Sequence, residues 1–515
     1  MSKESTVLDD PRSANTFPQL LRAAAAAHGD GIAIMLKDAS IPDEQMTFIE
    51  LERSSAELAR GLMARGIGKG ARVAYIYGNS PGFALMLAAI CRIGAIAIPV
   101  STMIRSNELV RVLRQSDAAG LIVQRRYLGN DYVDRLCDAL PELKTGDNVD
   151  LRISKTPYLR WVLSTGGELP RTMQDISVLT EGARTVSEEL LQETESEIHP
   201  SDQMIEIYTS GSMALPKGVR HNHGPVLFRT HYLSSMLNPQ PGKQIVVQLP
   251  LFWVGGLMMT LLPNLEAGAT SVCTERTLSN SRVAMGSVLA AEDLKLMAQA
   301  KPYWALGMSE TLGPYSYADI LRDPNYPLCA PLDHIAERYE VRVVDEHDRP
   351  VAQGETGEIQ VRGYALTPGL HKVERSGYFT ADGFYHTGDM GLIEGSRILF
   401  VGRNGDMIKT AGANVSPAEV EMEIQELEGV HSAYVVGVPD PERGQMLVAT
   451  VVPREGATLD FGQIQEALRQ RLSGYKVPRA YFSITREEVP LLHSNKVARR
   501  QLQAWVANKL GRSTS

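Results

Sequence analysis

The 515-residue chain has few cysteines, and none of them lie close together. The four cysteines are Cys91, Cys137, Cys273 and Cys329, and they form no CxxC motif. Disulfide frameworks and structural zinc sites need clustered or regularly spaced cysteines, so we expect neither of them here. The amino-terminal stretch MSKESTVLDDPRS is polar and acidic, unlike a secretory signal. These features favour a cytoplasmic protein, in a reducing compartment.

The chain also lacks a long basic run and an unbroken apolar segment. Its net charge is −8 and its pI about 5.9, whereas nucleic-acid-binding proteins present a basic face, so we expect no nucleic-acid partner. The most apolar stretch, residues 81–100, contains Arg92 in its middle and is broken at Gly94. We interpret it as a helix followed by a buried strand over residues 95–100, and not as a membrane span.

The composition that is present is typical of a globular protein, with 43% hydrophobic and 22% charged residues. Between residues 17 and 140, helix patterns such as FIELERSSAELARGLMARG alternate with short apolar runs such as ARVAYIYG and AIAIPV. This alternation predicts an α/β domain with a largely parallel sheet. Residues 144–204 are more polar, and we interpret them as a solvated connector.

The pattern changes in the last third of the chain. From about residue 330, the stretch YEVRVVDEHDRPVAQGETGEIQVRG alternates apolar and polar residues, which predicts antiparallel strands of a small barrel. After residue 404, the stretches SPAEVEMEIQELEGV and FGQIQEALRQRLSGYKVP predict helices, and HSAYVVGVPD and GQMLVATVVPREG predict strands. The tail is therefore expected to be a compact α+β unit.

The stretch IYTSGSMALPKGVRHNHG, residues 207–224, has the composition of a phosphate-binding loop. Hydroxyl groups, a glycine that allows close backbone approach and a lysine are all suited to phosphate. These residues are Thr209, Ser210, Gly211, Ser212 and Lys217. The spacing is not that of G-x-x-x-x-G-K-[ST], so this is not the loop of that nucleotide-binding class. Taken alone, the stretch is also compatible with a surface turn.

Four further stretches favour the phosphate-binding interpretation over a surface turn. They are LGMSETLGPYS (306–316), FYHTGDMG (384–391), FVGRNGDMIKTAGANVSPAEVE (400–421) and PLLHSNKVARRQL (490–502). In this order and spacing, the five stretches resemble the core motifs of the adenylate-forming superfamily, which includes acyl-CoA synthetases, amino-acid adenylation domains and luciferases. The resemblance covers about residues 17–505. It implies that a carboxylate attacks the α-phosphorus of ATP to give an acyl-adenylate, and that a thiol, usually that of coenzyme A, then displaces AMP.

The resemblance also implies the domain organisation. We expect an α/β fold in which a large AMP-binding domain, residues 1–403, contains two parallel-sheet subdomains and a barrel-like portion at about 330–403. A small mobile α+β lid domain would follow at residues 404–515. The hinge between them would be Gly405, which also belongs to the strong turn dipeptide Asn404-Gly405.

Nucleotide-binding roles follow from the same resemblance. The β- and γ-phosphates would be cradled by Thr209, Ser210, Gly211, Ser212 and Lys217. Glu310 would hold Mg²⁺. Asp389 would accept hydrogen bonds from the ribose hydroxyls. The predicted catalytic residues are Thr209, Lys217, Glu310 and Lys496. The predicted contacts to ATP or coenzyme A are Thr209, Ser210, Gly211, Ser212, Lys217, Gly307, Met308, Ser309, Glu310, Asp389, Arg403, Gly412 and Lys496.

The stretch PLFWVGGLMM, residues 250–259, resembles the segment that borders the acyl pocket in this superfamily. Its predicted pocket residues are Phe252, Trp253, Gly255, Gly256 and Met258. An apolar wall with an adaptable methionine favours a fatty or aromatic acid over an amino acid, although core packing is the alternative for each residue singly. The interval from Gly256 to Gly307 is shorter than in most relatives, and residues 286–294 are what would remain of an adenine-contacting loop.

We therefore expect an ATP-dependent, AMP-forming acyl-CoA ligase that uses ATP, Mg²⁺ and CoA with a small-molecule carboxylic acid. One alternative is a non-catalytic or weakly active relative, suggested by Met213, Ala214, Asn495 and the short interval. Another is an adenylating enzyme with a carrier-protein thiol as acceptor. The sequence is also compatible with a homodimer.

Replacing Lys496 by alanine tests the catalytic role that the resemblance gives it, which is to bridge the carboxylate and the α-phosphate. Losing one preorganised donor lowers a rate by on the order of 10²–10³, so adenylation should fall by about that factor. Conversion of a supplied acyl-adenylate to the thioester should continue. Pyrophosphate exchange and thioester formation, measured on one preparation, separate the two steps, and an equal loss in both would refute the assignment.

Overall fold

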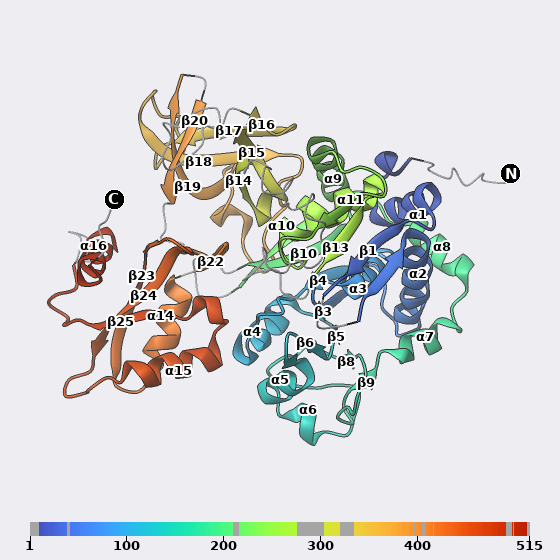
Figure 1. Cartoon of the computed structure of the whole chain (residues 1–515), viewed down its shortest axis with the longest axis horizontal. Coiled ribbons are helices and arrows are strands. Elements are labelled where there is room, and N and C mark those ends of the chain that lie inside the picture. The colour runs from blue at the N-terminus through green and yellow to red at the C-terminus, as the bar shows by residue number, and fades with distance from the viewer. Residues whose placement is uncertain are drawn as a thin grey trace. The chain divides into compact units, whose positions relative to one another are not determined.

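The computed structural model describes most of the chain and divides it into two compact units (Figure 1). The residues it describes are 10–38, 42–209, 216–274, 303–319, 334–395, 397–403, 408–415, 417–490, 497 and 499–511. The large unit comprises residues 1–102, 113–208 and 218–402, and the small unit comprises residues 103–112, 209–217 and 403–515. A mixed α/β fold with one large and one small unit confirms the predicted fold class.

A mostly parallel sheet of seven strands forms one core of the large unit. The strand order is β11-β10-β4-β3-β5-β8-β9, and the pairs from β10 to β9 run parallel. The strands are β3 (Arg72–Ile76), β4 (Ile96–Pro99), β5 (Gly120–Val123), β8 (Trp161–Ser164), β9 (Gln174–Asp175), β10 (Gln203–Thr209) and β11 (Lys217–Asn222). Strands β4, β5 and β8 are buried along their whole length, as parallel strands covered on both faces are.

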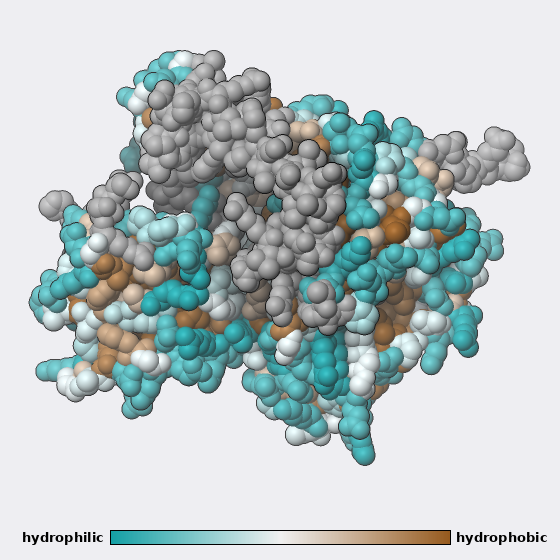
Figure 2. All heavy atoms as spheres, viewed as in Figure 1, coloured by the Kyte–Doolittle hydropathy of each residue, from teal (hydrophilic) through white to brown (hydrophobic). Residues whose placement is uncertain are grey.

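The apolar stretch 81–100 forms a helix and a strand, as predicted. Helix α3 (Pro81–Cys91) ends before Gly94, which has a φ of +69°, and β4 follows. Arg92 is buried in this turn, where its Nε donates to Glu195 Oε1 over 2.5 Å. Among the described residues, no helix is long and apolar enough to span a membrane. Figure 2 shows hydrophilic residues over much of the visible surface, with hydrophobic ones between them.

The interpretation of residues 144–204 as a connector is wrong. They include the buried strand β8 and the helices α7 (Ser177–Ala183) and α8 (Glu188–Ser196). Helix α7 packs against α2 (Phe48–Ala64), and the two helices lie side by side in Figure 1. A strand of four residues between polar stretches gives too weak a periodic signal to be detected, and the many acidic residues of α8 are largely exposed.

The remaining sheets of the large unit are smaller. One has the order β12-β13-β1-β2, with strands β12 (Gln244–Val246), β13 (Thr270–Cys273), β1 (Ile32–Leu36) and β2 (Glu44–Thr47). A second is antiparallel, with β14 (Tyr303–Met308), β15 (Gly313–Asp319) and β16 (His334–Ile335). A third contains β17 (Tyr339–Val344), β18 (Thr356–Gly363), β19 (Tyr385–Glu394) and β20 (Arg397–Arg403). The antiparallel pairing of β17, β18 and β19 confirms the strand type predicted after residue 330.

Several helices and short strands complete these layers. The helices are α1 (Phe17–His28), α4 (Ser106–Ser116), α5 (Tyr132–Ala139), α6 (Glu142–Thr145), α9 (His223–Leu237), α10 (Val254–Gly256) and α11 (Leu262–Ala267). Short turns of helix are η1 (Pro11–Ser13), η2 (Leu257–Leu261), η3 (Ser309–Thr311) and η5 (Arg375–Gly377), and η6 (Gly474–Lys476) lies in the small unit. Strands β6 (Arg126–Tyr127) and β7 (Asn130–Asp131) form a separate antiparallel pair.

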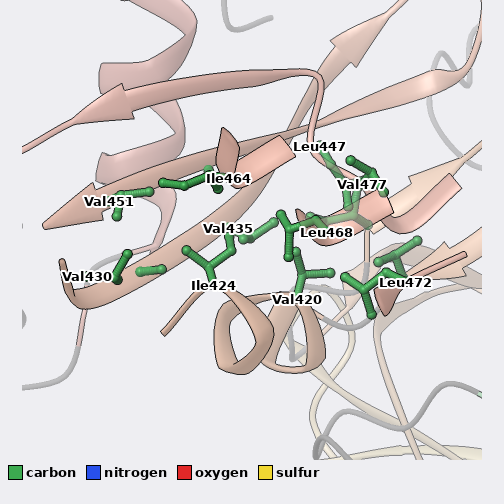
Figure 3. Close-up of a cluster of buried hydrophobic side chains, with 14 residues drawn as sticks. Val420, Ile424, Val430, Val435, Leu447, Val451, Ile464, Leu468, Leu472 and Val477 are labelled. Atoms are coloured by element: carbon green, nitrogen blue, oxygen red, sulfur yellow. The ribbon is translucent and has the colours of Figure 1, made fainter. Parts of the chain in front are cut away.

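The small unit has its own hydrophobic core. Its sheet has the order β22-β21-β24-β23, with β25 parallel to β24. The strands are β21 (Ile408–Thr410), β22 (Ala413–Val415), β23 (Val430–Asp440), β24 (Gly444–Pro453) and β25 (Ala480–Ser483), and the main helices are α14 (Pro417–Gln425), α15 (Phe461–Arg471) and α16 (Arg499–Lys509). Figure 3 shows Val420 and Ile424 of α14 gathered with Val435, Ile464 and Leu468 in one buried cluster. The α+β pattern predicted for the tail is confirmed.

Replacing Gly61 by alanine tests the contact between α2 and α7. A Cβ atom at Gly61 would lie 2.1 Å from the carbonyl oxygen of Leu179, and a backbone atom cannot rotate away. Overpacking of this kind costs about 1–3 kcal/mol, which exceeds the gain of about 1 kcal/mol that alanine brings to a helix interior. Urea unfolding should therefore show a less stable protein. The exposed Arg53→Ala on the same helix is the control, and a stabilised Gly61→Ala would contradict the close packing.

Candidate functional site

The turn between β14 and β15 presents two of the predicted nucleotide-binding residues, Ser309 and Glu310. The one-turn helix η3 occupies this turn, and the hydroxyl of Thr311 accepts from the Met308 amide over 3.1 Å. A Cβ atom at Gly307 would lie only 2.5 Å from the Gly313 carbonyl oxygen. Glycine at this position therefore allows the two strands to approach closely, and the approach fixes the direction in which the turn projects.

Glu310 is held by groups from the neighbouring chain segments. The phenol oxygen of Tyr385 donates to Glu310 Oε1 over 3.0 Å, and the Thr367 amide donates to the Glu310 carbonyl oxygen over 2.7 Å. The glutamate is partly exposed, whereas Tyr385 is buried. Magnesium in phosphate-transfer sites takes one or two protein carboxylates together with phosphate oxygens and water. A single, oriented and accessible carboxylate fits that requirement.

His221 is a site residue that the sequence reasoning missed. It is fully buried on β11, and its Nε2 lies 2.7 Å from the carbonyl oxygen of Ser309. A carbonyl oxygen can only accept, so the ring proton is on Nε2. Burial lowers the pKa of His221 to about 4, which keeps the ring neutral near pH 7. The signal available in the sequence was the pair of histidines in the stretch HNH, residues 221–223.

Asp389 lies on β19, the strand that also carries Tyr385. The residue is 4% exposed, and its backbone amide donates to the Thr387 hydroxyl over 3.0 Å. The structure thus brings Glu310 and Tyr385 into contact and places Asp389 on the same strand as that tyrosine. Ribose recognition by Asp389 stays a prediction.

The predicted phosphate-binding stretch is described only at its two ends. Thr209 is the last residue of β10 and Lys217 the first of β11, and these two strands are neighbours in the seven-stranded sheet. Both residues are partly buried. Ser210, Gly211 and Ser212, together with Met213 and Ala214, lie outside the described residues.

Other predicted residues are placed only in part. Lys496 and the predicted hinge Gly405 lie outside the described residues, and Arg403 is described only as the end of β20. Gly412 is exposed in the small unit and has a φ of +82°. A Cβ atom there would meet no atom within 4 Å, so its backbone conformation and not space favours glycine. Residues 286–294 also lie outside the described part of the chain.

The predicted acyl-pocket segment contains both buried and partly exposed residues. Phe252 is buried and packs edge-to-face on Trp253, with ring centroids 5.8 Å apart, and Trp253 and Gly255 are partly exposed. Met258 is fully buried on the π-helix η2, which is the environment of a core residue. A Cβ atom at Gly256 would lie 2.2 Å from the Pro250 carbonyl oxygen, so only glycine permits this bend. A π-helical turn is often found next to functional sites.

Two known protein families match parts of this chain. Residues 21–305 match the AMP-binding enzyme family, and residues 419–496 match the AMP-binding enzyme C-terminal domain. Among the described residues, no group of three or more His, Cys, Asp or Glu side chains is placed to hold a metal ion.

Several curated proteins are similar along nearly their whole length. The indoleacetate–CoA ligase of Aromatoleum aromaticum is 27% identical, and the alignment covers 91% of this chain and 94% of that protein. The feruloyl-CoA synthase of an Amycolatopsis species is 28% identical, with 89% and 93% covered. The long-chain-fatty-acid–CoA ligase of Salmonella typhimurium is 26% identical, with 91% of each chain covered.

Solved structures share the fold. The amide bond synthetase of Marinactinospora thermotolerans has a TM-score of 0.74 at 22% identity, with 94% of this chain and 99% of that one covered. An o-succinylbenzoate CoA synthetase of Bacillus subtilis has a TM-score of 0.71 at 20% identity, with 94% and 98% covered. Because the family match spans more than half of the sequence, the chain belongs to the AMP-binding enzyme family of the adenylate-forming superfamily.

Proposed function

We propose that this protein is an ATP-dependent, AMP-forming acyl-CoA ligase that activates a hydrophobic carboxylic acid. The observation that carries the proposal is the accessible Glu310 carboxylate, which accepts a hydrogen bond from Tyr385. Glu310 lies on the β14–β15 turn, and His221 links this turn to β11 through the Ser309 carbonyl oxygen. The names of similar proteins, which include CoA ligases for indoleacetate, ferulate and long-chain fatty acids, support the reaction class.

The reaction requires two anions to meet. In the first half-reaction, an oxygen of the substrate carboxylate attacks the α-phosphorus of ATP, and the bond to pyrophosphate breaks. In the second, the sulfur of coenzyme A attacks the carbonyl carbon of the acyl-adenylate, AMP leaves and the thiol proton is released. Enzymes accelerate such steps mainly by positioning the reactants and by placing donors and positive charge where negative charge collects.

The residues of this chain suit those needs. Glu310 would hold Mg²⁺, which neutralises phosphate charge when it is bound. Lys217 and the hydroxyl of Thr209, at adjacent strand ends, would contact the β- and γ-phosphates. Lys496 would contact the attacking carboxylate, and Asp389 would accept from the ribose. His221, neutral and buried, adds no charge and keeps the Ser309 carbonyl oxygen in place.

The acid itself is proposed to be fatty or aromatic. Phe252 and Trp253 form an edge-to-face pair next to the tight glycine bend, and a partly exposed aromatic ring suits an apolar ligand. Dispersed cysteines are consistent with a cytoplasmic enzyme. A homodimer is compatible with the reaction but is not required by it.

A substrate panel tests the proposal. The protein is mixed with ATP, Mg²⁺, CoA and one acid at a time, chosen from short, medium and long fatty acids and from aryl acetic, benzoic and cinnamic acids. We expect AMP and the acyl-CoA to form in equal amounts with at least one of these acids. A folded protein that forms no AMP with any acid would contradict the proposal. AMP formation that needs a carrier protein instead of CoA would show that the acceptor is wrong.

Two carboxylate variants are compared in the same assay, Glu310→Gln as the test and Glu346→Gln as its control. Glu310→Gln should lower AMP formation by on the order of 10²–10³, the usual cost of losing one preorganised electrostatic contact. Glu346→Gln changes a carboxylate of the same unit that is 88% exposed, and it should behave like the unmodified protein.

A further inference from the structure

A buried carboxylate lies close to both strand ends of the predicted phosphate-binding stretch. Glu206 is on β10, three residues before Thr209, and its side chain is 0% exposed. It accepts from the phenol of Tyr208 over 2.7 Å and from the side-chain amide of Gln203 over 3.2 Å. It is also paired with the guanidinium of Arg72 on β3, which β4 separates from β10 in the sheet. With these three donors, both carboxylate oxygens of Glu206 have hydrogen-bond partners.

The network continues from Arg72 to a histidine. Arg72 Nη2 lies 3.2 Å from His371 Nδ1, and His371 Nε2 lies 3.1 Å from Asp117 Oδ2. Because a guanidinium can only donate, His371 Nδ1 accepts and its proton is on Nε2, which donates to Asp117. Lys372 donates to the other oxygen of Asp117 over 2.5 Å. Each side chain of this hydrogen-bond network therefore has a defined role as donor or acceptor.

The same network touches the beginning of β11. The His371 amide donates to the Gly218 carbonyl oxygen over 2.7 Å, and Val219 forms an antiparallel bridge with Leu370. A Cβ atom at Gly218 would lie 2.6 Å from Glu206 Oε1 and 2.8 Å from the Tyr208 phenol oxygen. Gly218 thus leaves the space in which the carboxylate and the phenol meet. Tyr208 directly precedes Thr209, and Gly218 directly follows Lys217.

An ordinary buried ion pair would stabilise the fold without any further role. Here the donors and neighbours of Glu206 include the residues next to Thr209 and Lys217, on two different strands. Burial and the nearby Glu206 charge raise the pKa of Tyr208, so its phenol keeps the proton that it donates. Loss of the Glu206 charge would leave the Arg72 guanidinium without its carboxylate partner and would loosen the contact with Tyr208.

We propose that Glu206, together with Arg72, Tyr208 and His371, is a positioning network that sets the relative placement of Thr209 and Lys217 for the phosphates of ATP. These residues act through the strand ends and do not contact the substrate. The inference rests on the proposed function, since it assumes that Thr209 and Lys217 bind ATP. It adds residues that are not themselves predicted phosphate contacts, two of which, Arg72 and His371, are distant in sequence from the phosphate-binding stretch.

Direct binding of ATP tests this network without any knowledge of the acid. Calorimetry with ATP and Mg²⁺ is performed on the unmodified protein and on Glu206→Gln, which keeps the size of the side chain and removes its charge. We expect ATP to bind about tenfold more weakly to the variant, the equivalent of one charge-assisted hydrogen bond. Tyr208→Phe removes only the phenol oxygen and should weaken ATP binding in the same direction, which keeps the test available if Glu206→Gln does not fold.

The matched control is Glu195→Gln, which also removes a buried carboxylate from an arginine pair of the large unit. Glu195 is 4% exposed on the side chain and pairs with Arg92, away from β10 and β11 in the hydrogen-bond network. It should lower thermal stability and leave ATP affinity unchanged. In turnover assays, Glu206→Gln should raise KM for ATP while KM for CoA stays the same, a split that general destabilisation does not produce.

The outcomes separate the two proposals. Unchanged ATP affinity in folded Glu206→Gln and Tyr208→Phe would overturn the positioning network alone. An equal loss of ATP affinity in Glu195→Gln would also overturn it, because the effect would then be general. An unmodified protein that binds no ATP would overturn both the network and the proposed function.

Discussion

The hydrogen bond from His221 to the Ser309 carbonyl oxygen joins two segments that are far apart in the sequence. One is β11, which begins at Lys217, and the other is the turn that presents Glu310. The bond is made inside the protein, where burial holds the pKa of His221 near 4 and so keeps the ring neutral. Because both partners are fixed by sheets on either side, the turn cannot shift without moving the strand.

The Glu206 network acts on the same strand from its other side. It connects β10 with β11 through Tyr208 and Gly218, and it reaches the segment around His371. Strand β11 is therefore held both to the Glu310 turn and to its neighbour in the sheet. Rigid support of this kind is what electrostatic catalysis requires, since donors that are already in place need no reorganisation during the reaction. The proposed ligase activity would use this support to keep its phosphate-binding groups in place.

The sequence predicted the features that have strong local patterns. The helix and strand within residues 81–100, the antiparallel strands after residue 330 and the α+β tail each have a clear period or a glycine stop, and the structure confirms them. The strand Trp161–Ser164 was missed because four residues between polar segments have no distinctive period. His221, Tyr385 and the Arg72–Glu206–His371 contacts were not predicted, because pairings between distant segments depend on tertiary packing. Lys496, Gly405 and Ser210–Ser212, predicted from the resemblance, stay predictions because they lie outside the described residues.

The proposed function requires Glu310, Thr209 and Lys217 to bind the same ATP molecule, with its metal held by Glu310. A crystal structure with a non-hydrolysable ATP analogue and Mn²⁺ in place of Mg²⁺ tests it most directly, because anomalous scattering locates the metal. We expect a metal peak within coordination distance of a Glu310 carboxylate oxygen, with the β- and γ-phosphates beside Thr209 and Lys217. A nucleotide bound elsewhere, or a metal that has no contact with Glu310, would contradict it.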